Sequence, residues 1–587
     1  MDLLGLRTLT VIGDAIKFIY ETTGDKLDID KIPLDDEATC SMLRKGDTQG
    51  VFQLESGGMT KLVMDLGPES FEDLIPLVAL YRPGPLGTGM VEDFIAGRHG
   101  EKTAEMLHPL LEPVLKDTFG VILYQEQVMQ ITSVLAGFSL GQADILRRAM
   151  GKKKAKELDS MREAFIDGAQ QKHGISPQLS SEIFALLQHF AGYGFNKSHS
   201  AAYALVAYQT AYLKAHWPAE FMAAFLTSVI SDSEKLSWYI SVCRSMGLKI
   251  LPPDVNESGR SFSVNKDRVI RFGLTGVKNV VENAIGSILQ ARKDGPFKSL
   301  MDFCKRVDNR AVNKRMLENL IKCGAMDSFG YKRSELLAVA EQAMDMGSNY
   351  QKDYQSGQMG LFGDDSFADV NELRIPELEE IPKRTILQYE KELIGFYVTG
   401  NPLDAYVGSL YYYTPLRKIS DASEVLDGKY FSVAGIISDC RIRNTRQGDS
   451  MAILTLEDFN GKMEIVVFPK VYRDAARLLY QENAISVEGK LSIDERERKI
   501  QALKIKPLQE VPPDLHIKIM KKDENGIVQK GLKQIFESFS GDTPVYLHLI
   551  DSGKMIKVER CFWVDGKNAG VYQALDDLLG ENWYLKG

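Results

Sequence analysis

The spacing of apolar side chains changes near residue 258 and again near residue 426. Between residues 11 and 258 apolar residues return every three or four positions, most clearly in SHSAAYALVAYQTAYLKAHWPAEFMAAFLTSVI. Tyr208 and Tyr212 lie one turn apart in this stretch, and Pro218 marks a helix break or a new first turn. The period predicts a large helical domain over 11–258.

Beyond residue 258 the helical period survives only in short stretches. LPPDVNESG, which ends at Gly259, has the prolines and glycine of a domain boundary. Two short helices are predicted around 273–292 and 312–324, inside a region that we place at 259–345. The next stretch, MGSNYQKDYQSGQMGLFGDDSF, is polar and has no period, so residues 346–425 are predicted to include a flexible linker.

In the last third of the chain the period of apolar positions becomes two. KYFSVAGIISDCRIR, SMAILTLEDFNGKMEIVVFP and AISVEGKLSID predict about five strands, with turns at residues such as Gly448 and Gly489. This spacing is typical of a small β-barrel, which we place at 426–510. Residues 511–587 combine the strand-like TPVYLHLI with a closing helix near VYQALDDLLG. The predicted fold class is therefore multidomain α+β, with helices first, a barrel later and a small α/β domain last.

Composition narrows the classes of protein that fit. The 587 residues are 44% hydrophobic and 26% charged, as in soluble chains with several cores and unlike disordered ones. No apolar stretch approaches the roughly 20 residues of a membrane-spanning helix, and no signal-peptide pattern is present, so we expect a cytoplasmic protein without membrane contact. The six cysteines lie apart, which predicts reduced thiols and argues against a zinc site.

Charge is distributed unevenly along the chain. The formal net charge of −9 argues against general affinity for nucleic acid, yet ILRRAMGKKKAK contains arginines and lysines without a single acid. Cations on both sides of Gly151 suit a triphosphate or a template backbone, because several phosphate oxygens must be neutralised together. The alternative is a solvated basic helix face, which charge alone favours.

Two other motifs place polar side chains on restricted backbone. In YRPGPL the prolines limit the directions that Arg82 can take, which suits phosphate recognition; the alternative is a simple turn with a solvated arginine. In FAGYGFNKSHSAAYA the residues Asn196, Lys197 and His199 lie at a predicted helix start, where free N–H groups and the helix dipole favour an anion. The alternative for His199 is a structural capping role.

Taken in chain order, GDTQGVFQLES, YRPGPL, ILYQEQVM, RRAMGKKK and FNKSHSAAYA closely resemble the fingers region of the bacterial DNA polymerase III alpha subunits, the C-family replicative polymerases. The resemblance continues to the end of the chain. It implies a DNA-directed DNA polymerase, a nucleotidyltransferase of DNA replication, whose fingers occupy 11–258 and whose palm ends within 1–10. The implied ligands are primer–template DNA and the incoming dNTP.

The resemblance also implies individual contacts. Residues similar to the family's dNTP- and DNA-binding positions are Gln53, Ser56, Arg82, Tyr124, Arg147, Arg148, Lys152, Lys153, Asn196, Lys197 and His199. The first two belong to a segment that in the family lies beside the nascent base pair.

The first residues raise the question of activity. DLLGLRTLT is similar to the palm strand that bears the family's third catalytic aspartate, so Asp2 would be a catalytic residue and a Mg²⁺ ligand. The family's other two carboxylates lie upstream of this strand. One carboxylate cannot hold two divalent ions, so we expect the chain alone to lack polymerase activity.

Other functions remain open at this point. The chain is either part of a replicative polymerase or a non-catalytic scaffold that binds DNA and the sliding clamp of the replication machinery. A scaffold of this kind could be one half of a split polymerase that regains activity with a separate N-terminal half. A lesion-bypass paralogue is a third alternative. The peptide GQMGLFG, which is similar to sliding-clamp-binding peptides, argues against it. The position of the barrel after the fingers argues against the other bacterial branch of the C family.

The region 259–345 lies where the family has a helix-hairpin-helix that grips duplex backbone. Here Asn279-Val280-Val281 replaces the usual Gly-x-Gly of the hairpin, which removes close backbone approach and an easy positive φ. The hairpin is therefore either structural or a DNA contact.

The linker contains GQMGLFG, similar to the peptide by which bacterial replication proteins bind the sliding clamp. Leu361 and Phe362 would be its apolar anchors, with Gln358 and Met359 fixing the register. We therefore expect a clamp-binding region within 346–425, although apolar pairs in loops also pack intramolecularly.

The barrel resembles an OB-fold, a common binder of single strands. Arg441, Arg443 and Arg446 are its expected single-stranded DNA contacts. Tyr430, Phe431 and Phe468 are either base-stacking or core residues. In the family the tail, here 511–587, contacts the tau subunit of the clamp loader.

Overall fold

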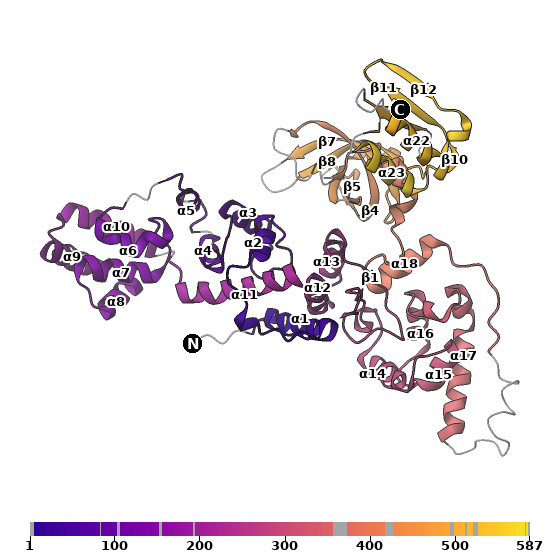
Figure 1. The fold of residues 1–587 in the computed structure, drawn as a ribbon, viewed down its shortest axis with the longest axis horizontal. Helices are drawn as coiled ribbons and strands as arrows, with labels where there is room; N and C mark the ends of the chain where they lie inside the picture. Colours follow the sequence, from indigo (N-terminus) through magenta and orange to yellow (C-terminus); the bar gives the residue numbers. More distant parts are fainter. Residues whose placement is uncertain are drawn as a thin grey trace. The chain divides into compact units, whose positions relative to one another are not determined.

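In a computed structural model the chain forms two compact units, Met1–Val398 and Thr399–Gly587 (Figure 1). The structure describes all residues except 1–4, 83, 88, 103–105, 152–154, 192–193, 356–372, 417–418, 420–425, 446, 460, 494–497, 511–513, 521–525, 581–582 and 585–587. None of the helices among the described residues is long and apolar enough to cross a membrane.

The first half of unit 1 is helical, as the period of three to four residues predicts. Its helices are α1 (Arg7–Thr23), α2 (Glu37–Arg44), α3 (Gly57–Leu66), α4 (Leu74–Leu80), α5 (Met90–Arg98), α6 (Glu112–Leu115), α7 (Gln125–Ala136), α8 (Leu140–Gly151), α9 (Ala155–His173), α10 (Pro177–Ala191), α11 (Lys197–His216), α12 (Pro218–Ser228) and α13 (Ser233–Ser245). Pro218 is the first residue of α12, where its missing N–H costs nothing.

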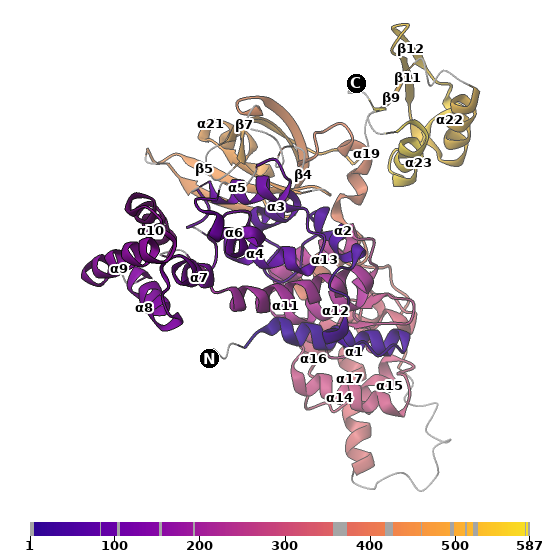
Figure 2. The same cartoon turned by 60° about the vertical axis from the view of Figure 1, so that its left-hand side comes forward.

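The 20-residue helix α11 connects the two main cores of this region. Along its middle, Ala204, Ala207, Tyr208 and Ala211 pack into a core with α2–α5. Near its C-terminal end Leu213 belongs to the core that α1, α12 and the following helices share. In both ribbon views α1, α11 and α12 lie side by side (Figures 1 and 2).

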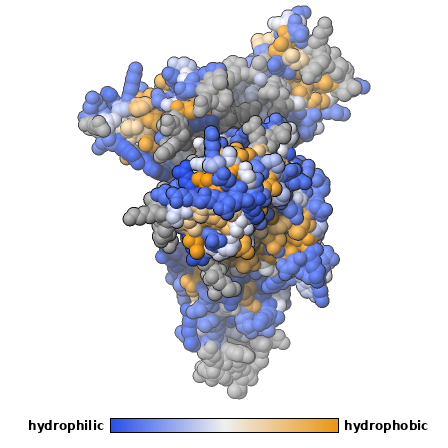
Figure 3. Space-filling view, turned by 90° about the vertical axis from the view of Figure 1, so that its left-hand side faces the viewer, coloured by the Kyte–Doolittle hydropathy of each residue, from blue (hydrophilic) through white to orange (hydrophobic). Residues whose placement is uncertain are grey.

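Helices α7–α10 form a group with a separate core. Gly168 on α9 lies directly against the carbonyl oxygen of Ala136 at the end of α7, so any side chain at position 168 would collide with backbone. The face of the molecule drawn in Figure 3 is mostly hydrophilic, with smaller apolar patches. In this group of helices Leu140 and Ile145 are exposed apolar residues.

The rest of unit 1 combines a small sheet with five helices. Its elements are β1 (Ile250–Leu251), β2 (Ser263–Val264), β3 (Ile270–Arg271), α14 (Glu282–Ala291), α15 (Leu300–Arg306), α16 (Lys314–Lys322), α17 (Arg333–Gln355) and α18 (Lys383–Ile394), and the strand order is β1-β3-β2. Helices α14 and α16 lie within the two predicted stretches. The linker prediction is wrong for residues 346–355, because α17 continues through them with partly buried residues against α15.

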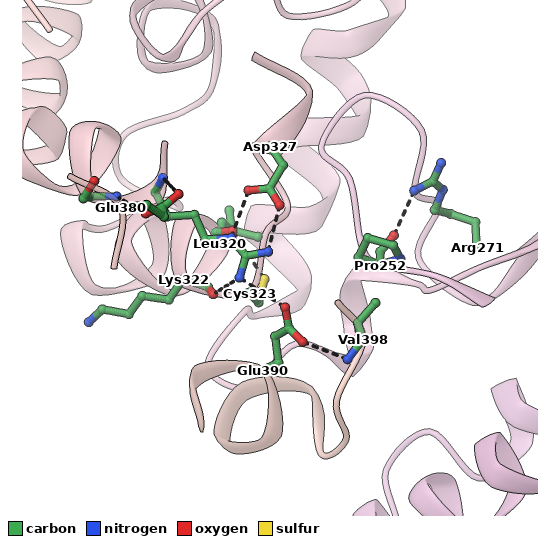
Figure 4. A network of polar contacts seen from close by, with 11 residues as sticks. Pro252, Arg271, Leu320, Lys322, Cys323, Asp327, Glu380, Glu390 and Val398 are labelled. Atoms are coloured by element: carbon green, nitrogen blue, oxygen red, sulfur yellow. Dashed lines mark hydrogen bonds and ion pairs between the residues drawn. The ribbon is translucent and has the colours of Figure 1, made fainter. Parts of the chain in front are cut away.

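A buried ion pair attaches α18 to the start of α17. Arg333, 4% exposed, donates to both carboxylate oxygens of Asp327 (2.7 and 3.0 Å) and to Glu390 of α18 (3.2 Å). Glu390 is fully buried and also accepts the N–H of Val398 at 2.8 Å (Figure 4). Glu380 accepts the backbone N–H of Arg333 at 3.1 Å. Three separate chain segments therefore meet at one guanidinium.

Unit 2 contains the predicted barrel. Strands β4 (Tyr430–Asn444), β5 (Ser450–Glu457), β6 (Lys462–Val467), β7 (Ala484–Ile493) and β8 (Arg498–Pro507) close in the order β4-β5-β6-β8-β7, with α21 (Pro469–Ala475) between β6 and β7. All pairs are antiparallel except β6 with β8. The 15-residue β4 pairs with β7 along its first half and with β5 along its second, which closes the barrel.

The end of unit 2 is a small α/β domain, also as predicted. It contains β9 (Leu515–Ile519), α22 (Gly526–Ser538), β10 (Ser540–Thr543), β11 (Val545–Leu549), β12 (Lys554–Lys557) and α23 (Ala569–Leu579), and its sheet has the order β12-β11-β9. The segment before the barrel, which includes α19 (Val407–Leu410), packs on both domains: Leu403 and Leu410 contact the barrel, and Val407 and Tyr411 the α/β domain.

Candidate nucleotide and nucleic-acid interface

A continuous run of ring contacts crosses the N-terminal part of α11. The Arg82 guanidinium lies over the Phe195 ring, 4.6 Å from its centroid. Phe195 meets His199 edge-on at 5.4 Å, and His199 stacks on Tyr203 at 4.3 Å. Tyr203 in turn contacts Phe52, with centroids 5.4 Å apart. The segments YRPGPL, FNKSHSAAYA and GDTQGVFQLES, far apart in sequence, therefore share one surface.

A backbone bridge brings two further segments to this surface. Tyr124 and Phe195 pair as a short parallel bridge, and the Gln125 N–H donates to Phe195 O at 2.9 Å. The Gln125 amide nitrogen donates to Gly194 O at 2.9 Å, and its oxygen accepts from Arg147 Nη1 at 2.8 Å. ILYQEQVM and the first residues of the basic cluster are thereby tied to the ring contacts.

The arginines of this surface are only partly neutralised. Asp144 accepts from Arg147 at 2.7 and 3.1 Å and pairs with Arg148 at 2.9 Å. The Arg147 hydrogen bond lowers the pKa of Asp144, so the carboxylate is ionised and shared by two guanidinium groups. Arg82 is exposed, and its side-chain contact among the described residues is the Phe195 ring. The surface retains a surplus of positive charge.

The start of α11 differs from the prediction of free N–H groups. Asn196 caps the helix by accepting the His199 N–H at 2.8 Å, and the Glu126 carboxylate accepts the Lys197 N–H at 3.1 and 3.2 Å. These two N–H groups are occupied, so the prediction is wrong for them. His199 is not the capping residue either. An anion here would meet the exposed side chains of Asn196 and Lys197.

Tyr124 and Lys197 line the same cavity of about 400 Å³, whose walls include Phe94, Phe119 and Arg98. Tyr124 is 2% exposed, and burial raises the pKa of its phenol, which therefore stays neutral. The Lys197 ammonium lies 5.5 Å from the centre of the Tyr124 ring. These two predicted residues lie together, whereas Asn196 and His199 are not among the residues that line this cavity.

Gln53 has an unusual backbone conformation next to the ring contacts. Its φ is +63°, in the left-handed region that disfavours residues with a Cβ, and its side chain is exposed. Ser56 lies at the start of α3 and is also exposed. Sequence reasoning singled out both but missed Phe52 and Tyr203. The spacing of His199 and Tyr203, one turn apart on a predicted helix, was a signal for the second.

Several predicted residues lie outside the described residues. They are Asp2, Lys152, Lys153, Gln358, Met359, Leu361, Phe362 and Arg446. Their roles stay predictions.

Three family models match the chain. The model of the bacterial DNA polymerase III alpha subunit finger domain matches residues 8–173, a helix-hairpin-helix motif matches 247–336, and an OB-fold nucleic acid binding domain matches 431–508. Among curated relatives, the DNA polymerase III subunit alpha of Thermus aquaticus is 42% identical over 94% of this chain and 45% of its own length. Those of Pseudomonas aeruginosa and Escherichia coli K12 are 41% and 43% identical, over 99% and 84% of this chain and 52% and 43% of their own lengths.

The chain belongs to the DNA polymerase III alpha subunit family. It spans about half the length of the curated relatives it matches. The family that the motifs predict is thereby confirmed, and so is the mixed fold class with its helical fingers and OB-fold barrel.

The magnesium pair of two-metal polymerases does not fit the described residues. Among them, no three His, Cys, Asp or Glu side chains gather where they could hold a metal ion. Two divalent ions need several oxygen ligands each, so this part of the chain provides no cage for them.

One residue in the hairpin of the helix-hairpin-helix region has a positive φ without being glycine. Asn279 adopts φ +66°, so the expectation that a positive φ is lost with glycine is wrong. Asparagine tolerates this region better than most residues, because its side chain can hydrogen-bond locally. The neighbouring Lys278 N–H donates to Leu393 O of α18 at 2.8 Å and is therefore not free for a phosphate.

The predicted contacts of the barrel fall into two groups. On the β4–β5 ladder Arg443 pairs with Met451. The next residue of β5, Ala452, pairs with Val467 of β6, and Phe468 directly follows Val467. Phe468 is 45% exposed, and the ladder register puts it at the same end of the barrel as Arg443. Tyr430 and Phe431 lie at the opposite end of the long strand β4.

Phe431, Tyr430 and Arg441 differ in how exposed and how engaged their side chains are. Phe431 packs against the barrel core, as its alternative interpretation has it, whereas Tyr430 is 72% exposed. Arg441 is exposed but donates to Asp439 at 2.7 Å.

Proposed function

We propose that this chain is the fingers, helix-hairpin-helix, clamp-binding and OB-fold part of a replicative DNA polymerase. In this proposal the surface around α11 binds primer–template DNA and the triphosphate of an incoming dNTP. The barrel binds single-stranded DNA. A replication role would place the protein in the cytoplasm, with the chromosome.

The observation that carries the proposal is the convergence of five sequence motifs on one surface. Aromatic rings from Phe52 to Phe195 form its base, and Arg82, Arg147, Arg148 and Lys197 lie at or near its edge. Rings suit the faces of bases, and guanidinium groups suit phosphate oxygens. A solvated basic helix would not need the hydrogen bonds that fix Arg147 through Gln125.

Arg147 and Arg148 are suited to a triphosphate because they already share one carboxylate. An incoming triphosphate carries more negative charge than Asp144 and competes with it for both guanidinium groups. The partial neutralisation by Asp144 keeps the arginines ordered before binding. We assign Lys152 and Lys153 to the same phosphates on the family resemblance.

Binding of DNA and nucleotide tests this assignment directly. A labelled primer–template should bind the full chain, and the matching dNTP should tighten binding. Arg147→Ala and Arg148→Ala should remove the effect of dNTP, whereas Arg162→Ala on the exposed surface of α9 should not. Equal dNTP enhancement in all variants would contradict the assignment.

The metal chemistry is assigned to the family and not to the described residues. When bound, a Mg²⁺ pair would align the primer hydroxyl with the triphosphate, and Asp2 is our proposed contribution to its ligands. We expect no polymerase activity from the chain alone. Primer extension with only template, primer, dNTPs and Mg²⁺ added would contradict this expectation.

The second candidate is a non-catalytic scaffold or one half of a split polymerase. For a split polymerase, addition of the separate N-terminal half should restore primer extension. A scaffold should stay inactive in the same assay.

We propose that the segment between α17 and α18 binds the sliding clamp through Gln358, Met359, Leu361 and Phe362. Both flanking helices pack on the same core of unit 1, so the peptide has fixed attachment points. Leu361→Ala with Phe362→Ala should abolish clamp binding without changing the melting temperature. Unchanged clamp affinity would exclude this peptide.

For the barrel we propose single-stranded DNA binding near Arg441, Arg443 and Arg446. Its log affinity should fall with log salt by about 0.7 for each phosphate contacted. Binding that does not respond to salt would indicate a protein ligand instead.

For residues 511–587 we propose the contact with the clamp loader's tau subunit, which deletion of these residues should remove.

A further inference from the structure

The loop between α2 and α3 holds Gln53 in a conformation that its own chemistry disfavours. A left-handed φ is unfavourable for a residue with a Cβ, and such residues persist only where the surroundings over-determine them. Val51 and Leu54, on either side of this residue, are fully buried. The buried side chains of Val51 and Leu54 therefore anchor the loop backbone, and the Gln53 side chain between them is exposed to solvent.

Helix α11 holds the first part of this loop from beneath. Lys214, 3% exposed, donates from Nζ to the carbonyl oxygens of Asp47 and Gln49, both at 2.8 Å. One turn earlier, Thr210 Oγ1 accepts the N–H of Phe52 at 3.1 Å. Both side chains lie on the stripe of α11 that also bears Tyr203, the ring partner of Phe52.

Helix α13 holds the second part through a carboxylate. Glu55 accepts the Gly50 N–H at 3.1 Å and the Tyr239 hydroxyl at 2.5 Å. Gly50 itself has φ +78°, a left-handed conformation that favours glycine, and lies beside the Phe221 and Phe225 rings. The loop is thus held on both sides of Gln53, by Thr210 and Lys214 of α11 and by Tyr239 of α13.

The geometry does not allow Lys214 to contact bound DNA directly. It is buried, so it cannot reach a phosphate of bound DNA. Burial of an ammonium group is expensive, and a methionine of similar length would fill the same volume without that cost. Its hydrogen bonds to two loop carbonyls are what a methionine could not supply.

We propose that Lys214, assisted by Glu55 and Tyr239, is a positioning residue that holds the Asp47–Glu55 loop so that Gln53 contacts a primer–template bound on the fingers surface. This inference rests on the proposed DNA-binding function of the fingers surface. It assigns to Lys214 an effect that passes entirely through Gln53.

The test compares affinities of the full chain for a fluorescein-labelled primer–template with a recessed 3′ end and for a blunt duplex of equal length. Gln53→Ala and Lys214→Met should each weaken recessed-end binding by roughly 5–10-fold, the size of one or two hydrogen bonds, and change blunt-duplex binding less than 2-fold. Lys235→Met, an exposed lysine on α13, is the control and should change neither affinity.

The double variant separates positioning from general damage. Because Lys214 acts through Gln53, adding Lys214→Met to Gln53→Ala should cause no further loss. Hydrogen exchange of the Asp47–Glu55 amides should rise in Lys214→Met. An additional loss in the double variant, or unchanged recessed-end binding in Lys214→Met, would overturn the proposal.

Failure of the underlying function looks different. If the unmodified chain does not prefer the recessed end, the fingers assignment fails and this inference fails with it. If the unmodified chain prefers that end but Gln53→Ala binds it normally, only this inference fails. Should Lys214→Met not fold, Tyr239→Phe and Glu55→Ala remove the other attachment of the loop. They must then show the same non-additivity with Gln53→Ala, or the proposal is wrong.

Discussion

Arg333 Nη1 and the carboxylate of Glu390 lie 3.2 Å apart with both side chains almost fully buried. Removal of Glu390 would leave the buried Arg333 with the partly exposed Asp327 as its remaining carboxylate partner. Glu390→Ala is therefore expected to destabilise unit 1 by about 3 kcal/mol, the lower end of the range for a broken buried pair. Hydrogen exchange of α18 and the melting temperature measure the effect.

The matched control for this prediction is an exposed pair. Lys17 and Glu21 are one turn apart on α1, at 3.8 Å and largely exposed, so Glu21→Ala should cost less than about 1 kcal/mol. If the two variants behaved alike, the Arg333 pair would contribute no more than a surface pair.

Helix packing in the α7–α10 group depends on Gly168. A Cβ there would press on the Ala136 carbonyl, so Gly168→Ala should destabilise this group by about 1–3 kcal/mol. Gly13 in the middle of α1 meets nothing within 4 Å, and Gly13→Ala should stabilise by about 0.5–1 kcal/mol. Opposite shifts of the melting temperature are the expected result, and equal shifts would refute the packing argument.

Burial lowers the pKa of Lys214 to about 8, from an ordinary value of 10.5. Between these two values the unfolded chain binds the proton and the folded chain does not, so the stability of the folded state rises with pH in this window and is lost as pH falls toward 8. The difference in unfolding free energy between the unmodified chain and Lys214→Met should grow by about 1–2 kcal/mol from pH 8 to pH 9.5. Denaturant titrations at the two pH values measure it; a difference that shrinks would refute the sign.

Asp144 restrains the two arginines of α8. Asp144→Asn should release them and tighten primer–template binding several-fold at low salt, with a steeper dependence on salt. Asp159→Asn removes the same charge from an exposed position on α9 and should have a much smaller effect. Weaker binding in Asp144→Asn would mean that orientation of the arginines matters more than their charge.

The two ends of β4 should differ in DNA binding. Phe468→Ala, at the same end of the barrel as Arg443, should weaken single-stranded DNA binding by about 1–3 kcal/mol, the value of one stacked base. Tyr430→Ala at the opposite end should leave it unchanged, although Tyr430 is the more exposed ring. Filter binding with an oligothymidine tests both variants, and the reverse order would move the site to the other end.

Periodicity predicted the helical region, the barrel and the final α/β domain, because each buries one face with its own repeat. It failed for residues 346–355, where polar residues of α17 pack on α15 and only the neighbouring helix reveals their environment. Local signals also missed α18, whose attachment depends on Arg333, far away in the sequence.

For the interface, motifs identified most residues but not how they are connected. The ring run joins segments more than a hundred residues apart, and no local pattern indicates that Phe52 meets Tyr203. Nor could composition show that the Glu126 carboxylate accepts a hydrogen bond from the Lys197 backbone N–H. Long-range pairing of this kind is decided by packing, which a single sequence does not display.

One helix bears both His199, in the ring run, and Lys214, beneath the Gln53 loop. At 1.5 Å per residue these two positions are separated by about 22 Å along α11, and each residue turns the helix by about 100°. Deletion of a single residue between them would swing one stripe away from its partners while the other stayed in register. Evolution of this stretch can therefore proceed by substitution but not by small insertions or deletions.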